Sequence, residues 1–387
     1  MSFRKKNIIL GVPAAGAPEE FASKLGKGHA PGTRPSPLDG RLTISTGTAS
    51  LDQCLSGHAG LPLGNAILLE ESGTTDFSGV VLKYYAAEGL VQGHHVHVFG
   101  VGDAWRSELP GLSQLPRTSK ARNSNGSDDK MKIAWRYESL SRGGEPPHSS
   151  MGEQQISDAK SLSVPFCHAF DLATKLESRD CKGDLHVIRP TMPPTPKHTA
   201  RKSPSLLQLY TVSLAEAMHS SPPGSVHRVV VPNLLSPASY GPTTSKPSEV
   251  LQFLHALRAL LRKYGSRLSA MISVSTALYS RSTGLVRWME TLLDGVVELV
   301  PLQQPVHAQP GSKSDDAAQG MLNIHRLPVS GELGIGPGGR LSQENLSFKL
   351  SSSSGLVIKP YSLPPVGNTA DANDAASKDT KTHDLSF

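Results

Sequence analysis

The sequence predicts an α/β fold built on one mostly parallel central sheet that is flanked by helices. Short apolar runs typical of buried strands alternate with longer runs typical of helices. The clearest unit is a strand over Ala66–Glu71, a helix over Val80–Glu88 that Gly89 is placed to end, and a strand over His95–Phe99. A strand, a helix and a second strand in this order predict a parallel crossover.

The same alternation continues along the chain, with several Pro-rich and polar stretches between the elements. The further expected elements are an ordered start at Leu42–Gly47, a short helix at Ser50–Leu55, strands at Lys132–Tyr137 and Leu185–Ile188, a helix at Leu206–Met218, a strand at Arg228–Val231, a helix from Ser248 to Gly265, a strand at Ala270–Val274, a helix at Leu285–Leu293, and a strand at Gly295–Val300. Two last strands, Gly320–Ile324 and Ser347–Leu350, are expected to add to the sheet antiparallel.

Composition divides the chain into one domain and its disordered extensions. The chain contains 36 Gly and 30 Pro, and only 37% of its residues are apolar. This is too little apolar side chain for a hydrophobic core that extends through the whole chain. We expect a disordered N-terminal arm over residues 1–40, a domain over residues 41–361 and a disordered C-terminal tail over residues 362–387. Loops this long are uncommon in compact folds. The expected polar insertions within the domain cover about 113–130, 139–161, 191–204, 236–247 and 303–319.

Charge and cysteine content set the expected compartment. The net charge of +6 permits an anionic partner such as nucleic acid, and equally suits an ordinary basic protein. Three cysteines give no disulfide framework, which favours a reducing compartment. The apolar run near the N-terminus is too short for a signal sequence, and no stretch is long enough to span a membrane. We expect a soluble protein of the cytoplasm and nucleus, although Arg4-Lys5-Lys6 is too short to count as an import signal.

The loop after the first strand has the frame of a nucleotide-binding loop without its chemistry. A working phosphate loop reads G-x-x-x-x-G-K-[ST], and its Lys contacts the β- and γ-phosphates. Here Gly73, Thr74, Thr75 and Asp76 occupy the loop, no Lys follows, and Asp76 places a negative charge where a phosphate would lie. We therefore predict a degenerate and empty phosphate loop, no cofactor and no catalytic residues.

A second part of an ATP site is also missing. ATPases of this type hold Mg²⁺ with an acidic residue at the end of another buried strand. The candidate strand Arg228–Val231 runs into Asn233, which carries no charge. Three alternatives remain: an active ATPase with a divergent loop, a catalytic pair formed by Glu70 and Glu71, and a nucleotide held between subunits with groups from a partner.

Histidine and cysteine clusters raise the question of a metal. His95 and His97 share one face of a strand beside His94, but spacing fixes no third ligand. A second group contains Cys167, His168, Cys181 and His186, and its spacing matches no zinc pattern. We expect no metal; a metal-dependent hydrolase is the alternative. No Gly-x-Ser-x-Gly elbow is present.

A basic and aromatic loop indicates a nucleic-acid contact. Tyr279 and Arg281 follow the Ala270–Val274 strand, at the strand end where α/β folds place ligands. One aromatic ring and one cation suit base stacking and phosphate contact. We predict RNA binding by Tyr279, Arg281 and Lys246, with Arg201-Lys202 as a further basic pair. Ordinary solvated loop charges are the alternative.

Several sequence blocks carry a family resemblance. The opening from Ile44 to Gly64 resembles that of RecA-like ATPase domains. More narrowly, the chain resembles the Elongator complex protein 4 family, and the blocks that carry this resemblance are Gly32–Ser36, Glu70–Phe77, Tyr84–Leu90, Met131–Tyr137, Phe166–Leu172 and Glu344–Leu350.

The resemblance implies a RecA-like fold without a working phosphate loop. It also implies a hetero-hexameric ring with Elongator complex proteins 5 and 6, which docks on the catalytic Elongator subunits and binds tRNA. Those subunits modify the wobble uridine of certain tRNAs at carbon 5, so the chemistry belongs elsewhere in the complex. The chain departs from the family pattern through its insertions after Gly111, Ser139 and Thr191.

Overall fold

A nine-stranded sheet forms the centre of the protein. The computed structural model describes residues 29–55, 57–113, 165–188, 204–241, 244–302, 318–328, 345–351 and 355–361. In spatial order, the strands of the sheet are β14 (Gly355–Pro360), β13 (Leu346–Ser351), β12 (Gly320–Arg326), β11 (Gly295–Pro301), β4 (Ala66–Glu71), β10 (Leu268–Ser275), β9 (His227–Val231), β5 (His95–Phe99) and β8 (Leu185–Ile188).

The sheet is parallel over six strands and antiparallel at one end. Strands β11, β4, β10, β9, β5 and β8 pair parallel with their neighbours. Strands β12, β13 and β14 continue the sheet antiparallel from β11. The expected α/β class and the two antiparallel additions are therefore confirmed, whereas β14 is a strand that the sequence did not predict.

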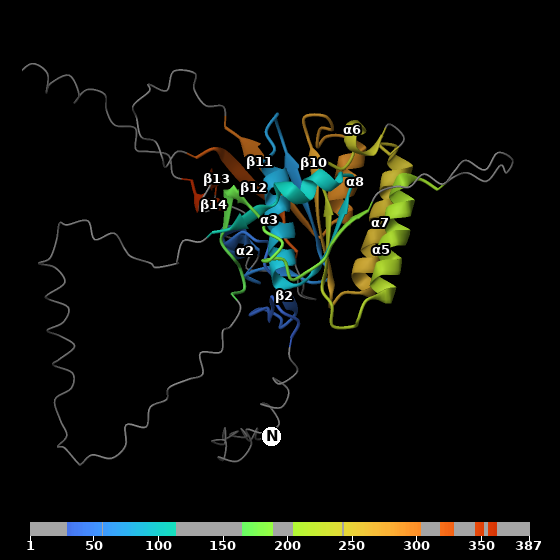
Figure 1. Ribbon diagram of the computed structural model, residues 1–387. Coiled ribbons are helices and arrows are strands. Elements are labelled where there is room, and N and C mark those ends of the chain that lie inside the picture. The colour runs from blue at the N-terminus through green and yellow to red at the C-terminus, as the bar shows by residue number, and fades with distance from the viewer. Residues whose placement is uncertain are drawn as a thin grey trace, which may run out of the picture. The chain divides into compact units, whose positions relative to one another are not determined.

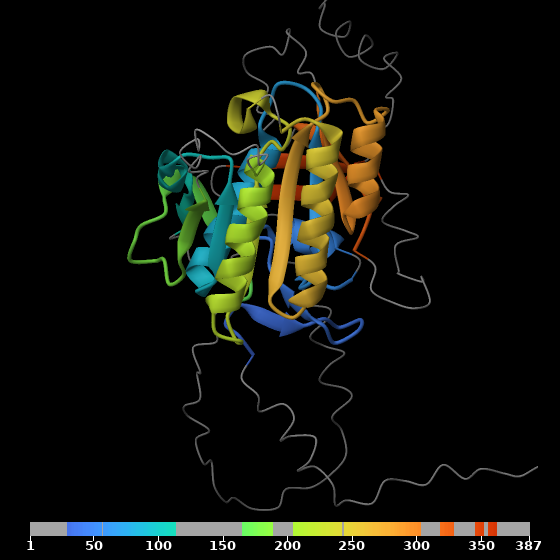
Figure 2. The same ribbon diagram turned by 90° about the vertical axis from the view of Figure 1, so that its right-hand side faces the viewer.

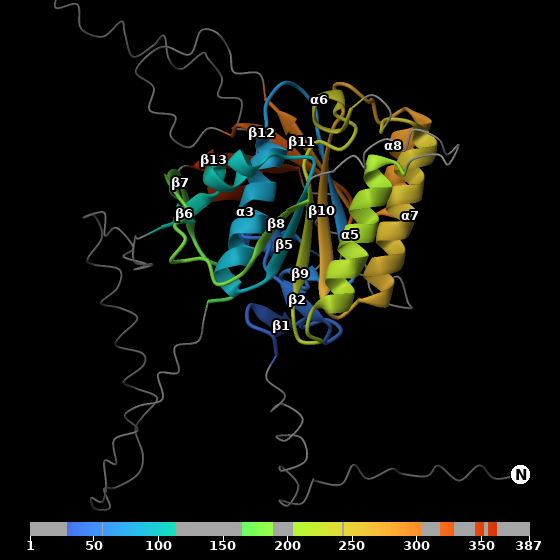
Figure 3. The ribbon, with the colours of Figure 1, turned by 45° about the vertical axis from the view of Figure 1, so that its right-hand side comes forward.

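Helices cover both faces of the sheet, as Figures 1 and 3 show. Helices α2 (Ala49–Cys54) and α3 (Phe77–Gln92) pack on one face, and α5 (Leu206–Ser220), α7 (Pro247–Lys263) and α8 (Gly284–Leu292) pack on the other. In Figure 2 the second group forms a layer in front of the strands. Strand β4 is apolar on both sides because Ile67 and Leu69 meet the α3 layer while Ala66 and Leu68 meet the α7 layer. No helix in the described ranges is long and apolar enough to cross a membrane.

Helix α3 is longer than its sequence pattern predicts. It does not end at Gly89 but continues to Gln92 and stops at Gly93, whose φ of 87° is left-handed. Gly89 has a packing role instead, because a Cβ atom there would lie 2.7 Å from Cδ of Arg228. The missing side chain lets a buried arginine from β9 pass against the helix.

The N-terminal arm is shorter than expected. Strand β1 (Thr33–Pro35) pairs with β2 (Leu42–Ile44), which pairs with β3 (Leu61–Pro62) in a separate antiparallel sheet. The Arg34 guanidinium lies 3.6 Å from the centre of the Phe166 ring. Strand pairing and this cation–π contact hold Thr33–Pro35 in a defined structure, although composition alone assigns these residues to the disordered arm. A further small sheet joins β6 (Pro110–Leu112) to β7 (Phe170–Lys175), and the 3₁₀ helix η1 (Asp103–Glu108) precedes it.

The expected insertion at 236–247 contains ordered structure. Helix α6 (Pro237–Tyr240) starts with a proline, whose fixed φ suits a first helical turn, and α7 begins at Pro247. The buried Tyr240 hydroxyl donates hydrogen bonds to the carbonyls of Phe99 and Pro232. The other four insertions lie wholly or almost wholly outside the described residues, as do residues 1–28, the expected strand at 132–137 and the tail over residues 362–387.

Candidate functional site

The predicted phosphate loop, Gly73 to Asp76, lies at the carboxyl end of β4, beside the ends of β9 and β10. In Figure 1 it is the blue loop at the top of the sheet, near α6. A cavity of about 280 Å³ opens there, at the strand ends where α/β folds bind ligands. The structure therefore brings together the predicted loop residues and the predicted aromatic Tyr279. The residues that line the cavity are Gly73, Thr74, Thr75, Asp76, Asn233, Leu234, Ser236, Ser275, Leu278 and Tyr279.

A carboxylate of the chain itself occupies the start of helix α3. Oε1 of Glu71 accepts hydrogen bonds from the Phe77 N–H at 2.9 Å and the Thr75 hydroxyl at 2.7 Å. Its Oε2 accepts one from the Ser78 N–H at 2.8 Å. Asp76 stands at the N-cap position of α3. Glu71 thus caps α3 from the preceding strand.

This arrangement removes the anion site that a phosphate loop needs. Free amides at a helix N-terminus attract phosphate, and here Glu71 uses two of them while remaining only 4% exposed. Burial raises the pKa of Asp76, and the Glu71 charge raises it further. None of the described residues that line the cavity is Lys or Arg. The cavity suits neutral hydrogen-bonding groups and disfavours a triphosphate.

The end of β9 contributes Asn233 to the cavity. Asn233 lines the cavity, and its backbone N–H donates to Oγ of Ser273 at 2.8 Å. Its φ of 46° is left-handed, a conformation that asparagine tolerates better than most residues. The cavity wall therefore offers an amide where an ATPase presents the carboxylate that binds Mg²⁺ through water.

The predicted RNA-contact residue Arg281 is engaged by acidic side chains. Its Nε lies 2.8 Å from Oε2 of Glu70 and 2.9 Å from Oε1 of Glu290. Nη1 lies 3.9 Å from Oε2 of Glu298, and the Arg281 side chain is 33% exposed. Burial raises the pKa of Glu70, and the neighbouring Glu290 adds to this effect. Three carboxylates around one guanidinium leave little positive potential for a phosphate, and they give Glu70 a structural partner.

The other two predicted contacts lie in different surroundings. Tyr279 lines the cavity and also packs against the apolar layer under α7. Lys246 is exposed at the N-cap position of α7 and is not part of the cavity lining. RNA binding by these residues stays a prediction, and Lys246 is more accessible than Arg281, whereas Arg201 and Lys202 lie outside the described residues.

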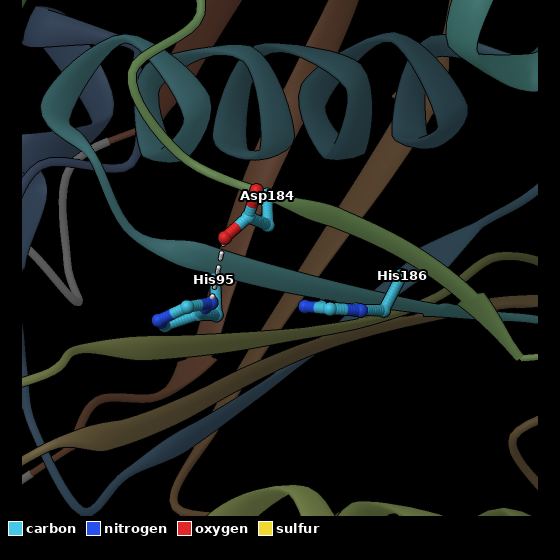
Figure 4. A group of neighbouring side chains, drawn as sticks. All are labelled: His95, Asp184 and His186. Atoms are coloured by element: carbon cyan, nitrogen blue, oxygen red, sulfur yellow. Dashed lines mark ion pairs between the residues drawn. The ribbon is translucent and has the colours of Figure 1, made fainter. Parts of the chain in front are cut away.

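The histidines next to α3 have separate roles. His94 is buried, with Nε2 2.8 Å from the Pro31 carbonyl oxygen. His97 is buried against His227, with 2.9 Å between Nε2 and Nδ1. His95 lies instead beside Asp184 and His186, as Figure 4 shows. Within the described residues, neither Cys167 nor Cys181 joins this group.

Two buried polar groups away from the cavity were not identified from the sequence. Arg228 is fully buried, and its Nη1 donates to the carbonyls of Ser45 at 2.8 Å and Tyr85 at 3.0 Å. Asp52 accepts hydrogen bonds from the Ser45 hydroxyl and the Thr46 amide, and burial raises its pKa to about 6. The only sequence signal for Arg228 is a charged residue within the apolar strand β9.

Replacing Glu71 with alanine is expected to lower the free energy of unfolding by about 2 kcal/mol, because two amides of α3 lose their charged acceptor. Urea denaturation measures this change. Glu108→Ala is the matched control, since Glu108 is 52% exposed in its ion pair with Lys83 and its loss should cost less than about 1 kcal/mol. Equal losses in the two variants would contradict a capping role for Glu71.

Comparisons with known proteins identify the family. The family model described as PAXNEB protein matches residues 27–387. Elongator complex protein 4 of Schizosaccharomyces pombe is 31% identical over 373 residues, covering 90% of this chain and 91% of the relative. The Saccharomyces cerevisiae protein of that name is 29% identical, covering 80% and 72%, and the human one is 28% identical, covering 90% and 82%.

A solved structure of a KaiC-like protein from Pyrococcus horikoshii also matches, with a TM-score of 0.40 and 12% identity, covering 82% of this chain and 99% of that one. The family model spans all of the described residues, including the loop between β4 and α3. The chain therefore belongs to the PAXNEB family, the family of Elongator complex protein 4.

Proposed function

We propose that this chain is a non-catalytic subunit of the Elongator complex. In this proposal it assembles with Elongator complex proteins 5 and 6 into a hetero-hexameric RecA-like ring that binds tRNA and supports wobble-uridine modification at carbon 5. The names of the relatives support membership of the complex. The observation that carries the non-catalytic role is Glu71, whose carboxylate occupies the helix terminus that an ATPase offers to phosphate.

Two exposed apolar side chains support a role in assembly. Leu278 lines the cavity and is 65% exposed, and Trp288 on α8 is 57% exposed. Tryptophan is enriched in the buried centres of protein interfaces. A neighbouring subunit that covers the cavity would bury Leu278 and close the cavity between two chains.

Light scattering tests assembly directly. The full chain is measured alone and then mixed with Elongator complex proteins 5 and 6. A single species with the mass of a six-subunit ring is the expected result. A monomer in both samples would contradict the proposal.

Hydrolysis of ATP separates the scaffold from an active ATPase. Each sample is incubated with ATP and Mg²⁺, and phosphate release is measured. The proposal expects no release by this chain alone, because no Lys is among the described residues that line the cavity and Asn233 at the end of β9 carries no charge. Mg²⁺-dependent hydrolysis by the purified chain that Asp76→Ala abolishes would favour the ATPase instead.

Charge reversal at Lys246 tests the tRNA contact. In the assembled ring, Lys246→Glu is expected to weaken tRNA binding several-fold and to lower its salt dependence, because a cation that faces phosphate is lost. Lys175→Glu is the matched control, an equal change of charge at an exposed position on β7. Equal loss of affinity in both variants would show a general charge effect and no contact at Lys246.

A further inference from the structure

Two histidines and an aspartate meet at one edge of the central sheet. His95 begins β5, His186 lies in the neighbouring edge strand β8, and Asp184 directly precedes β8. Each offers a ligand atom, and these atoms all lie within 4.8 Å of one another. Figure 4 shows the two imidazole rings side by side, with Asp184 reaching to His95. The Nδ1 atom of His95 lies 3.4 Å from Oδ2 of Asp184.

Parallel pairing of the two strands creates this group. His97 stands opposite His186 in the register of β5 and β8, so His95 lies two residues before that pair on the same face. The backbone N–H of Val96 donates to the carbonyl oxygen of Asp184 at 2.8 Å, which fixes Asp184 next to the start of β5. His95 lies about ninety residues before Asp184 and His186 in the sequence, so local spacing does not reveal the group of three.

We propose that His95, Asp184 and His186 bind one divalent transition-metal ion of the zinc class. Two imidazoles and one carboxylate form a donor set that suits zinc and related ions and leaves a position for water. Ligand atoms around one zinc ion lie roughly 3.4 Å apart for bonds of about 2.1 Å. Asp184 and His186 are exposed, so rotation of these two side chains closes the remaining distance without movement of the strands.

Two further histidines stack on the ligand rings. The His95 ring stacks on His227 with centroids 4.8 Å apart, and the His186 ring stacks on His97 at 5.0 Å. His227 is fixed in turn by Ser225, whose Oγ lies 2.8 Å from its Nε2.

The ion would stabilise the pairing of the edge strand β8 with β5. Strand β8 pairs only with β5 among the described strands, and a bond from each strand to one ion would join them at their first residues. Because the ion binds the folded edge and not the unfolded chain, it would raise the temperature of unfolding. This property belongs to the single chain and does not depend on assembly with other subunits.

The experiment uses the full chain purified without a polyhistidine tag and stripped of metal with a chelator. Co²⁺ is titrated while visible absorption is recorded, and Zn²⁺ is then added in competition. The expected result is one equivalent of Co²⁺ per chain, displaced by one equivalent of Zn²⁺, with a rise of the unfolding temperature on addition of Zn²⁺.

Three variants assign the binding to this site. His186→Asn and Asp184→Asn change exposed side chains and should each lower Co²⁺ affinity at least about 10-fold and abolish the thermal shift. His255→Asn, which changes an exposed histidine on α7, should bind as the natural chain does. The proposal is overturned if no stoichiometric binding occurs, or if His186→Asn and Asp184→Asn bind Co²⁺ as tightly as the natural chain.

Discussion

Replacing Gly47 with alanine is expected to lower the free energy of unfolding by more than about 3 kcal/mol. Gly47 has a left-handed φ of 78°, and a Cβ atom there would lie 2.3 Å from the carbonyl oxygen of Tyr84 in α3. Because the contact is with helix backbone, no side chain can rotate away to relieve it. The segment between β2 and α2 would have to move off α3, with loss of the hydrogen bond from the Gly47 N–H to Oγ of Ser45.

Gly40→Ala is the matched control for the Gly47 variant. Its φ of 73° is nearly the same, but nothing lies within 4 Å of the added Cβ atom. This variant should show only the cost of a left-handed alanine, about 1 kcal/mol. Urea denaturation of both variants, with equal slopes, separates the two causes. Similar losses for the two variants would show that contact with α3 is not tight at Gly47.

Truncation of Arg228 to alanine is expected to cost about 3–5 kcal/mol. The side chain is fully buried, its guanidinium lies 4.7 Å from the centre of the Tyr85 ring, and its Nε donates to Nδ1 of His94 at 3.0 Å. Alanine would leave a cavity beside Gly89 and would remove the donors that the carbonyls of Ser45 and Tyr85 now share. Thermal and urea unfolding measure the loss.

Two further variants separate the contribution of the Arg228 hydrogen bonds from that of its packing volume and provide a control. Arg228→Met fills much of the volume without donating hydrogen bonds, so it should fall between the natural chain and Arg228→Ala. Arg262→Ala removes an exposed arginine from the last turn of α7 and should change stability by less than about 0.5 kcal/mol. If Arg228→Met were as stable as the natural chain, the hydrogen bonds to Ser45 and Tyr85 would contribute nothing.

Sequence pattern was sufficient for the elements whose signal is local. The apolar run Ala66–Leu69 and the amphipathic helix that ends near Lys263 were both located, because burial on two faces and burial on one face leave different periodicities. The end of α3 was missed because Gly89 resembles a helix stop. Its conformation is helical, and the reason for glycine is the Arg228 side chain, which lies about 140 residues away in sequence.

The candidate site was predicted only in part for the same reason. The absence of a phosphate-binding Lys is visible in the sequence, and so is the neutral Asn233 after β9. The role of Glu71 could not be predicted from the sequence, because only the folded turn places its carboxylate next to the amides of α3. The sequence also did not show that Arg281 is paired with carboxylates. Its partners Glu70, Glu290 and Glu298 come from three separate elements, and only the fold brings them to the guanidinium.

The position of β4 in the sheet has a consequence for synthesis of the chain on the ribosome. Ala66 in β4 pairs with Ala270 in β10, roughly 200 residues later, and its other neighbour β11 follows β10 in the chain. At about 5–20 residues per second, β4 waits roughly 10–40 s for either partner. During that interval the apolar Ala66–Leu69 segment lacks both neighbouring strands, so a newly made chain carries an unpaired apolar strand that can aggregate.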